Sequence, residues 1–329
     1  MIVRLRGHKA FADSSDSSEG KKLRLRTADG YELGAFLYPA LRPRSPRRVA
    51  VVHPGAGIPA IRYSRFARFL AEWGIPVLTY DYRGIGLSRP PHLRGFEATI
   101  EDWAEFDSAA AIAWLRERFP DDELVGISHS IGCLPLGGAP NANEQARVVM
   151  VGAHTGYFGD YRPLYRLPMA LAWHGLMPAI TRWLGYFPAN RLRLGEDLPA
   201  GMALEWARRR GPDLGARNGD PWSDRRRQLL ERCAALQGRA LAICISDDAF
   251  ATARGTKRLL SYLPGLSSCE LVAYKPSDAG VRQIGHFGFF RRAAGMALWP
   301  RLIAQLDAGR AEVGQPAIAS GSVTKASSF

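Results

Sequence analysis

The chain has 329 residues, of which 47% are hydrophobic and 10% aromatic, and this composition is sufficient for one large folded core. It excludes an intrinsically disordered chain and a small domain held together by disulfides. The four cysteines show no paired C-x-x-C spacing, and the first twenty residues contain no apolar stretch of the length that a secretory signal needs. We therefore expect a cytoplasmic protein with free thiols.

The formal net charge of +13 indicates attraction to anionic partners, and two arginine triplets, 208–210 and 225–227, concentrate part of it. Neither a recognisable docking module nor aromatic residues interleaved with the basic ones accompany this charge, so we expect no nucleic-acid partner. We interpret the triplets as solvated faces. An alternative is that segment 208–227 receives a carboxylate or phosphate on the leaving group of a substrate.

The two ends of the chain differ from the body in composition. Residues 1–20 are rich in Ser and Asp, and residues 311–329 are small and polar, so both are predicted to be flexible tails. Residues 21–40 alternate apolar and polar side chains on either side of Asp29-Gly30, which predicts an antiparallel hairpin.

Strands and helices then alternate. Apolar runs at 48–54, 76–82, 123–128 and 147–153 predict buried strands, and two amphipathic helices are predicted between them. Alternation of this kind indicates a mostly parallel, doubly wound sheet with helices on both faces. The residues expected on the buried faces of the two helices are Phe66, Phe69, Leu70 and Trp73 for 61–74, and Trp103, Phe106, Ala110 and Trp114 for 100–119.

The alternation stops between 157 and 236, where the sequence is helical in character, rich in Trp, Pro and Arg, and without a convincing strand. Strands at 239–246 and 269–276 and a helix at 290–308 then complete the sheet. We predict a core of 21–156 and 237–310, with 157–236 inserted after the sixth strand as a helical lid.

The most apolar stretch of the insertion, 164–188, is interrupted by prolines and charged residues too often to cross a membrane, so we expect two short apolar helices and no stable membrane insertion. The interrupting residues are Arg166, Pro168, His174, Pro178 and Arg182.

Chemically useful residues follow four of the predicted strands, at the edge where open parallel sheets gather their reactive groups. A small-residue turn at 53–57 leaves backbone N–H groups free to face an oxyanion. The others are a serine pair at 128–130, an aspartate pair at 247–248 and a Gly-flanked histidine at 286. The order Ser, Asp, His along the chain is that of an α/β-hydrolase triad.

Five motifs carry a resemblance to the α/β-hydrolase superfamily over nearly all of 21–308: HPGAG at 53–57, DYRGIGLS at 81–88, SHSIG at 128–132, SDDAFA at 246–251 and GHFGFF at 285–290. The sequence looks most similar to the serine-aminopeptidase-like and monoglyceride-lipase-like hydrolases, and to a bacterial branch among them. The resemblance implies the α/β-hydrolase fold and a reaction that needs no metal or organic cofactor.

The elbow motif contains two serines, and Gly126 and Gly132 allow two registers. The family's usual pattern has His just before the nucleophile and Gly two residues after it, which matches Ser130. Ser128 then stands where Gly is usual, as a packing residue.

For the base, His286 is the histidine that follows the last strand in a loop able to reach the serine. The family pattern favours Asp248 over Asp247 as the acid, and the other aspartate would stabilise the turn. The resemblance also implies oxyanion donors from the backbone N–H of Ile131 and of Ala56, the latter preferred to Gly55. The remaining core histidines, His53, His129, His154 and His174, are expected to pack or to hydrogen-bond.

We expect acyl transfer to Ser130 and hydrolysis of an ester or thioester, with a small-molecule acyl substrate. Leu171, Trp173, Leu176, Met177, Trp183 and Tyr186 of the insertion would form an apolar roof over a hydrophobic acyl part, with Trp173, Met177 and Trp183 as substrate-binding residues, or would serve only the packing of the lid. Two alternatives stay open: an aminopeptidase, with Glu196 or Glu205 binding the amine, and an acyltransferase. Homo-oligomer formation is also left open.

Overall fold

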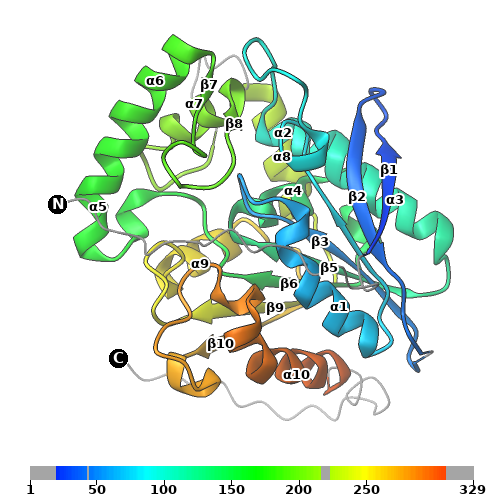
Figure 1. The fold of residues 1–329 in the computed structure, drawn as a ribbon. Coiled ribbons are helices and arrows are strands. Elements are labelled where there is room, and N and C mark those ends of the chain that lie inside the picture. Colours follow the sequence, from blue (N-terminus) through cyan, green and yellow to red (C-terminus); the bar gives the residue numbers. More distant parts are fainter. Residues whose placement is uncertain (1–19, 43, 216–222, 309–329) are drawn as a thin grey trace.

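The computed structural model describes residues 20–42, 44–215 and 223–308, which form a central eight-stranded sheet in the order β1-β2-β4-β3-β5-β6-β9-β10 (Figure 1). The predicted tails, apart from Gly20, lie outside the described residues. The strands of the large sheet are β1 Lys21–Arg26, β2 Glu32–Tyr38, β3 Arg48–His53, β4 Val77–Tyr80, β5 Glu123–His129, β6 Arg147–Val151, β9 Arg239–Ile245 and β10 Ser268–Tyr274.

The first two strands form the predicted antiparallel hairpin, and β2 also pairs antiparallel with β4. All other neighbouring pairs, from β4 to β10, are parallel. The turn between β1 and β2 places Gly30 at φ +85°, a left-handed backbone that favours glycine. The prediction of a mostly parallel sheet with an N-terminal hairpin is confirmed.

Two hydrophobic clusters fill the two faces of the sheet. Because successive side chains of a strand point to opposite faces, Val49 and Val51 of β3 belong to one cluster, whereas Ala50 and Val52 belong to the other. Helices α1 (Ser64–Glu72) and α10 (Arg292–Ala308) cover the second face. The first face is covered by α2 (Ile100–Asp102), α3 (Ala109–Arg118), α4 (Cys133–Gly138), α8 (Ser223–Ala234) and α9 (Ala253–Leu260).

The predicted helix at 100–119 forms, but its middle is a π-helical segment at Trp103–Ser108 that joins α2 to α3. The wider turn rotates the later residues about the axis. The buried positions after Trp103 are therefore different from those predicted, and Phe106, Ala110 and Trp114 are only partly buried. In α1 the predicted face is correct except for Trp73, which follows the helix and is exposed. The buried residues of this helical segment are Trp103, Ala104, Asp107, Ser108, Ala111, Ile112 and Leu115.

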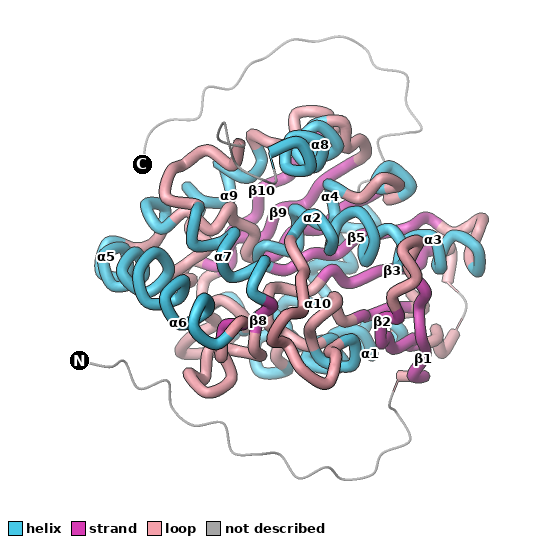
Figure 2. The backbone as a smooth tube through the Cα atoms, turned by 90° about the horizontal axis from the view of Figure 1, so that it is seen from above, coloured by secondary structure: helices cyan, strands magenta, loops and turns pink. Residues whose placement is uncertain are grey.

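The insertion follows the sixth strand, and its helices are α5 (Pro163–Leu171), α6 (Met177–Leu184) and α7 (Ala200–Arg208). They are drawn in green in Figure 1, where they lie at one corner of the molecule away from α10, and the view from above shows α5 and α6 at one side of the sheet (Figure 2). The two short helices predicted here are α5 and α6, and a π-helical segment at Ala172–Leu176 joins them into one continuous run. No described helix combines the length and apolar character needed to cross a membrane.

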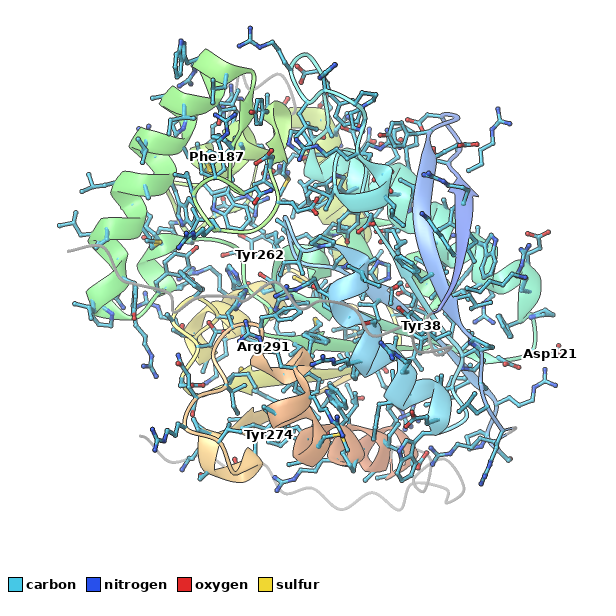
Figure 3. All side chains as sticks on the ribbon, viewed as in Figure 1. Tyr38, Asp121, Phe187, Tyr262, Tyr274 and Arg291 are labelled. Carbon is cyan, nitrogen blue, oxygen red and sulfur yellow. The ribbon has the colours of Figure 1, made fainter. Side chains whose placement is uncertain are left out.

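A small two-stranded sheet also occurs in the insertion, contrary to the prediction of no strand. It pairs β7 (Tyr186–Phe187) antiparallel with β8 (Leu198–Pro199). Phe187 is buried within the insertion (Figure 3). At the end of the insertion, α8 packs against α4, and a side chain on Gly138 would collide with Leu229 of α8. The last part of the predicted lid thus packs on the sheet domain.

Candidate active site

Ser130 lies on a strained turn between β5 and α4. Its φ of +57° is a left-handed value that residues other than glycine rarely adopt. Close packing requires Gly132 in the same turn, because a Cβ there would lie 2.4 Å from the carbonyl oxygen of Pro54. Ser128, in contrast, is inside β5 and buried, with its hydroxyl 3.5 Å from the carbonyl oxygen of Val149. Of the two serines, only Ser130 occupies the elbow.

The structure brings Ser130, His286 and Asp248 together from three separate strand ends. The Oγ of Ser130 lies 2.9 Å from Nε2 of His286, and Nδ1 of His286 lies 2.7 Å from Oδ2 of Asp248. The Asp248 carboxylate is buried, whereas His286 is partly exposed. A serine hydroxyl, an imidazole and a carboxylate are thus in hydrogen-bond contact, in the order that acyl transfer by a serine would require.

The two aspartates after β9 bind different groups. Asp248 accepts hydrogen bonds at Oδ1 from the backbone N–H groups of Phe250 and Ala251. Burial alone would raise the pKa of Asp248, but the nearby His286, its hydrogen bond and these two amides hold that pKa well below its usual range. Asp247 accepts from the backbone N–H groups of Ile284 and Gly285, so it holds the loop that carries His286.

His129, between the two serines, links three loops. Burial lowers the pKa of His129 to about 3, with a smaller contribution from His286, so its ring is neutral and has one donor and one acceptor nitrogen. Its Nε2 donates to the backbone carbonyl of His286 at 3.0 Å, so Nδ1 accepts from the hydroxyl of Tyr63 at 2.9 Å. That hydroxyl in turn accepts from the backbone N–H of Gly55.

The small-residue turn at 53–57 passes close to the elbow, because a Cβ on Gly55 would lie 3.4 Å from Cβ of Ser130. The N–H of Gly55 is already engaged by Tyr63. The N–H of Ala56 donates to no acceptor in the part of the chain that the structure describes. Of the two predicted alternatives in this turn, Ala56 is therefore the one with a free donor.

The Asp81-Arg83 turn, which belongs to the DYRGIGLS motif, holds neighbouring loops. Asp81 accepts from the backbone N–H of Ala60 and of Leu87, and burial raises its pKa to about 6 against the effect of these bonds. Arg83 pairs with the buried Asp107 and with Asp29 of the hairpin turn. These contacts stabilise the loops beside the serine.

A second histidine, His154, contacts Ser130, a contact that the sequence analysis does not predict. Nε2 of His154 lies 3.1 Å from Oγ of Ser130, and the ring is buried. The sequence contained a usable signal, since His154 follows the central strand β6 in a loop flanked by Gly152 and Gly156. A lone histidine after an apolar run more often packs or bonds within the core, so the sequence favours a structural role for it. The other histidines do so: His53 bonds Tyr80 and Gln145, and His174 donates to the carbonyl of Ala207.

The predicted apolar roof is only partly present. Trp173 is half-buried and contacts Trp206, which in turn contacts the ring of His154. Met177 is buried in the hydrophobic core. Trp183 is 80% exposed to solvent, so it is not part of a buried roof. Apolar composition suggested burial, but the continuous 163–184 helix has an outward face, where Leu171 and Leu176 also lie exposed.

The arginine triplets are not simply solvated faces. Arg209 and Arg226 are largely buried, and both pair with the Glu205 carboxylate, while Arg226 also pairs with Glu101. Burial would raise the pKa of Glu205, but the two guanidinium groups hold it below its usual range. Arg225 and Arg227 are likewise paired with carboxylates of the chain. These four arginines stabilise the protein rather than offer free charges.

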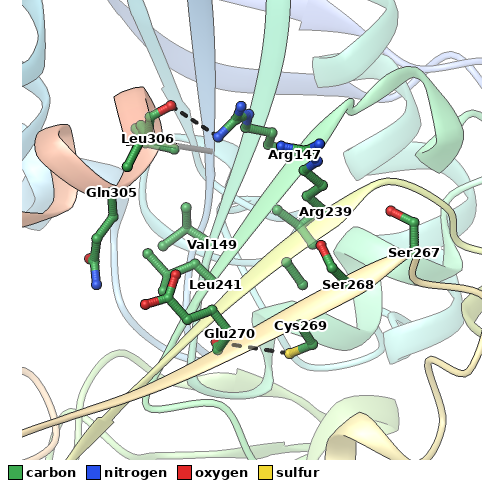
Figure 4. Close-up of a pocket in the computed structure, with 13 residues that line it drawn as sticks. Arg147, Val149, Arg239, Leu241, Ser267, Ser268, Cys269, Glu270, Gln305 and Leu306 are labelled. Atoms are coloured by element: carbon green, nitrogen blue, oxygen red, sulfur yellow. Dashed lines mark hydrogen bonds between the residues drawn. The ribbon is translucent and has the colours of Figure 1, made fainter. Parts of the chain in front are cut away.

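A pocket lies at the opposite edge of the sheet, at the amino ends of β6, β9 and β10 (Figure 4). Arg147, Arg239 and Glu270 are among its lining residues, and Arg147 donates to the carbonyl oxygen of Leu306. The triad side chains are at the carboxyl ends of the strands, so this pocket is separate from them. Within the described residues, no group of three His, Cys, Asp or Glu side chains is placed to hold a metal ion.

Comparisons with known proteins agree with this geometry. The family model for serine aminopeptidase, S33, matches residues 44–183. Comparison with curated proteins found no match. An esterase of Pyrococcus furiosus superposes with a TM-score of 0.56 at 14% identity, covering 92% of this chain and 96% of its own.

Two further solved structures are similar. A monoglyceride lipase variant from Saccharomyces cerevisiae has a TM-score of 0.55 at 16% identity, covering 87% of this chain and 96% of its own. An esterase of Exiguobacterium antarcticum has a TM-score of 0.55 at 14% identity, covering 86% of this chain and 98% of its own. The sheet order, the elbow and these similarities show that the chain has the α/β-hydrolase fold, and residues 44–183 are similar to the serine aminopeptidase family.

Proposed function

We propose that the protein cleaves a carboxylic ester or thioester through an acyl-enzyme on Ser130, with His286 as general base and Asp248 as the acid that orients it. The observation that carries the proposal is the unbroken hydrogen-bonded series from Oγ of Ser130, through His286, to Asp248. The strained backbone at Ser130 supports it, because such strain is retained where it presents a reactive group.

In acylation, Oγ of Ser130 attacks the acyl carbon and its proton passes to Nε2 of His286. The imidazolium is stabilised by Asp248, and it gives the proton to the departing alcohol or thiol as the bond from carbon to the leaving group breaks. In deacylation a water molecule attacks the acyl carbon, loses a proton to His286, and the bond to Oγ breaks as His286 returns the proton to Ser130. The chain's own side chains supply every proton transfer.

The negative oxygen that develops on the acyl group needs fixed donors, and we assign the backbone N–H groups of Ala56 and Ile131 to this role. The proximity of Gly55 to Ser130 and the free N–H of Ala56 support the assignment. The Tyr63 bond to Gly55 supports it further, because it holds the turn without using the Ala56 donor.

The surroundings of the base favour a hydrophobic acyl part. The Phe250 ring contacts His286, and Tyr161 contacts both Phe250 and His154. On the side of the insertion, Trp206 contacts His154. These aromatic rings would bury apolar acyl carbons and exclude water from the reacting oxygen. The similar structures are esterases and a monoglyceride lipase, which is consistent with such a substrate.

Aminopeptidase activity is the second candidate, because the matching family is described by that activity. It would need a free carboxylate for the substrate amine. Glu205 is buried between two arginines, and Glu196 accepts from the backbone N–H of Gly86. The two acids that the sequence offered are therefore occupied by the protein itself, which favours the ester.

The test compares p-nitrophenyl esters of graded chain length with aminoacyl anilides, on the wild type and on Ser130→Ala. We expect ester turnover that rises with acyl length, no anilide turnover, and loss of activity in the variant. A serine-directed fluorophosphonate should label the wild type and not the variant. Turnover of anilides alone would overturn the ester assignment, and labelling that survives Ser130→Ala would overturn the nucleophile.

An acyltransferase would share the same acylation step. It is distinguished by adding a small alcohol to the ester assay, because a transferase forms the new ester in preference to the free acid even when water is in large excess. We expect mainly the free acid.

A further inference from the structure

The His154 imidazole is a second ring in hydrogen-bond contact with the nucleophile, and the triad mechanism has no use for it. Its Nε2 lies 3.1 Å from Oγ of Ser130, while Nε2 of His286 lies 2.9 Å from the same oxygen. One serine hydroxyl thus contacts two imidazoles. Because it has a single proton, it can donate to only one of them.

The backbone decides which histidine receives that proton. The N–H of Gly156 donates to Nδ1 of His154 at 3.0 Å, so Nδ1 is the acceptor nitrogen and the ring proton is on Nε2. His154 therefore donates to Ser130, and the serine hydroxyl is left to donate to His286. Burial, with a contribution from the neighbouring His286, also lowers the pKa of His154 to about 3, so the ring stays a neutral donor at physiological pH.

The loop that carries His154 is held on three sides. The N–H of Gly152 donates to the carbonyl of Ile243 in β9, the hydroxyl of Thr256 in α9 donates to the carbonyl of Ala153, and Arg209 in α7 donates to the carbonyl of Thr155. A donor fixed in this way loses little freedom when the charge on its partner changes. This is the arrangement expected of a preorganised group.

The position of His154 separates it from the oxyanion donors. Strand β6 lies on one side of β5, and β3, which leads into the Ala56 turn, lies on the other. His154 therefore contacts the seryl oxygen itself and not the place where the acyl oxygen develops its charge. Its hydrogen bond gains strength when negative charge returns to Oγ, which happens when the acyl-enzyme breaks down.

We propose that His154 is a catalytic residue specific to deacylation, whose Nε2–H stabilises Oγ of Ser130 as the leaving group of the acyl-enzyme. In that step the water oxygen bonds to the acyl carbon and its proton goes to His286. The bond between that carbon and Oγ then breaks, its electron pair moves to Oγ, and His286 returns the proton there. His154 keeps its own proton throughout. The inference rests on the proposed acyl-enzyme at Ser130.

The free serine hydroxyl already accepts this hydrogen bond before attack, whereas the ester oxygen of the acyl-enzyme is a poor acceptor, so the bond lowers the barrier to acylation much less than the barrier to deacylation. Loss of the bond should slow deacylation by about 10- to 100-fold, the range expected for a hydrogen bond to a charged partner, and should leave acylation close to its original rate. The variant enzyme should therefore accumulate the acyl-enzyme. A purely structural role would lower both rates together.

Three variants test this by rapid-mixing measurement of p-nitrophenol release and by intact mass. His154→Phe keeps the ring but lacks the donor, His154→Asn keeps polarity but is too short to reach Oγ, and His154→Gln places an amide N–H near the original Nε2. We expect a burst followed by slow turnover, with the acyl mass retained, for Phe and Asn, and faster deacylation for Gln. If the Phe variant does not fold, the Asn and Gln pair still decides.

Two results would overturn the proposal: a deacylation rate constant that is unchanged in Asn or Phe, or a loss of acylation without accumulated acyl-enzyme. Failure of the proposed function looks different, since the wild type would then neither hydrolyse esters nor react with a fluorophosphonate. That outcome would contradict both proposals, and the wild-type assays that reveal it come before any His154 variant is made.

Discussion

The Tyr63 hydroxyl lies 2.9 Å from Nδ1 of His129 and also accepts from the N–H of Gly55, so one buried side chain connects the 53–57 turn to the elbow. Through His129 the connection continues to the carbonyl of His286. The turn at 53–57, the elbow and the loop of His286 are thus held in fixed positions by buried hydrogen bonds.

We predict that Tyr63→Phe lowers kcat at least tenfold and changes KM little, because it removes an acceptor from Gly55 and a donor from His129. Each group left unsatisfied in the interior costs about 1–3 kcal/mol, so the free energy of unfolding should fall too. The control is Tyr80→Phe, which breaks comparable buried bonds to His53 and Ser108. It should lose similar stability and keep most of its kcat. Equal kcat in the two variants would contradict the positioning role.

The two serines of the elbow allow a direct comparison. Ser130→Ala should abolish ester turnover, measured by steady-state kinetics, because it removes Oγ. Ser128→Gly should leave most of it, since the Ser128 hydroxyl makes only a 3.5 Å contact with a backbone carbonyl. Glycine within the strand should reduce the free energy of unfolding by about 0.5–1 kcal/mol. Severe loss of activity in both variants would contradict the packing role of Ser128.

The two adjacent aspartates make a second matched pair. Asp248→Asn should lower kcat by roughly 10³- to 10⁴-fold, because a neutral amide neither stabilises the imidazolium nor enforces the tautomer of His286. Asp247→Asn should have a much smaller effect, because its oxygen can still accept one of the two loop amides. Kinetics on one ester decide between them, and a larger loss from Asp247→Asn would reverse the assignment of the acid.

The residues that the sequence did reveal share a property: each follows a strand whose apolar pattern is unmistakable. Strand order and the right-handed crossover rule then bring Ser130, Asp248 and His286 to one edge. The contact of His154 with Oγ depends instead on the tight loop between Gly152 and Gly156, which periodicity does not describe. The exposure of Trp183 could not be predicted for a related reason, because an apolar helix face is buried only when another element covers it.

The buried histidines should make stability depend on pH with a definite sign. His53 is buried, and desolvation lowers its pKa to about 3, whereas an exposed histidine in the unfolded chain titrates near 6.5. Between these values the unfolded state binds one more proton, so His53 favours unfolding increasingly as pH falls from about 6.5 to about 3. Asp81 and Asp107 have the opposite effect on stability above pH 4, because burial raises their pKa values to about 6 and about 7.

We predict that His53→Gln reduces the slope of the unfolding free energy against pH by about 1.4 kcal/mol per pH unit between pH 4 and 6. Urea denaturation of both proteins measures the slope, and parallel curves would contradict the prediction.

The Glu205 cluster connects the insertion to the catalytic edge and can be tested against an exposed pair. Glu205→Gln leaves Arg209 and Arg226 without their shared carboxylate in the interior, which we expect to cost about 3 kcal/mol. Because Arg209 also holds the carbonyl of Thr155, the His154 loop should loosen and deacylation should slow in the same variant. Glu231→Gln removes the exposed partner of Arg227 and should leave the free energy of unfolding nearly unchanged, since solvent screens that pair. Denaturant melts and burst kinetics on the two variants measure both effects, and normal deacylation in a destabilised Glu205→Gln would show that the ion cluster stabilises the insertion without positioning His154.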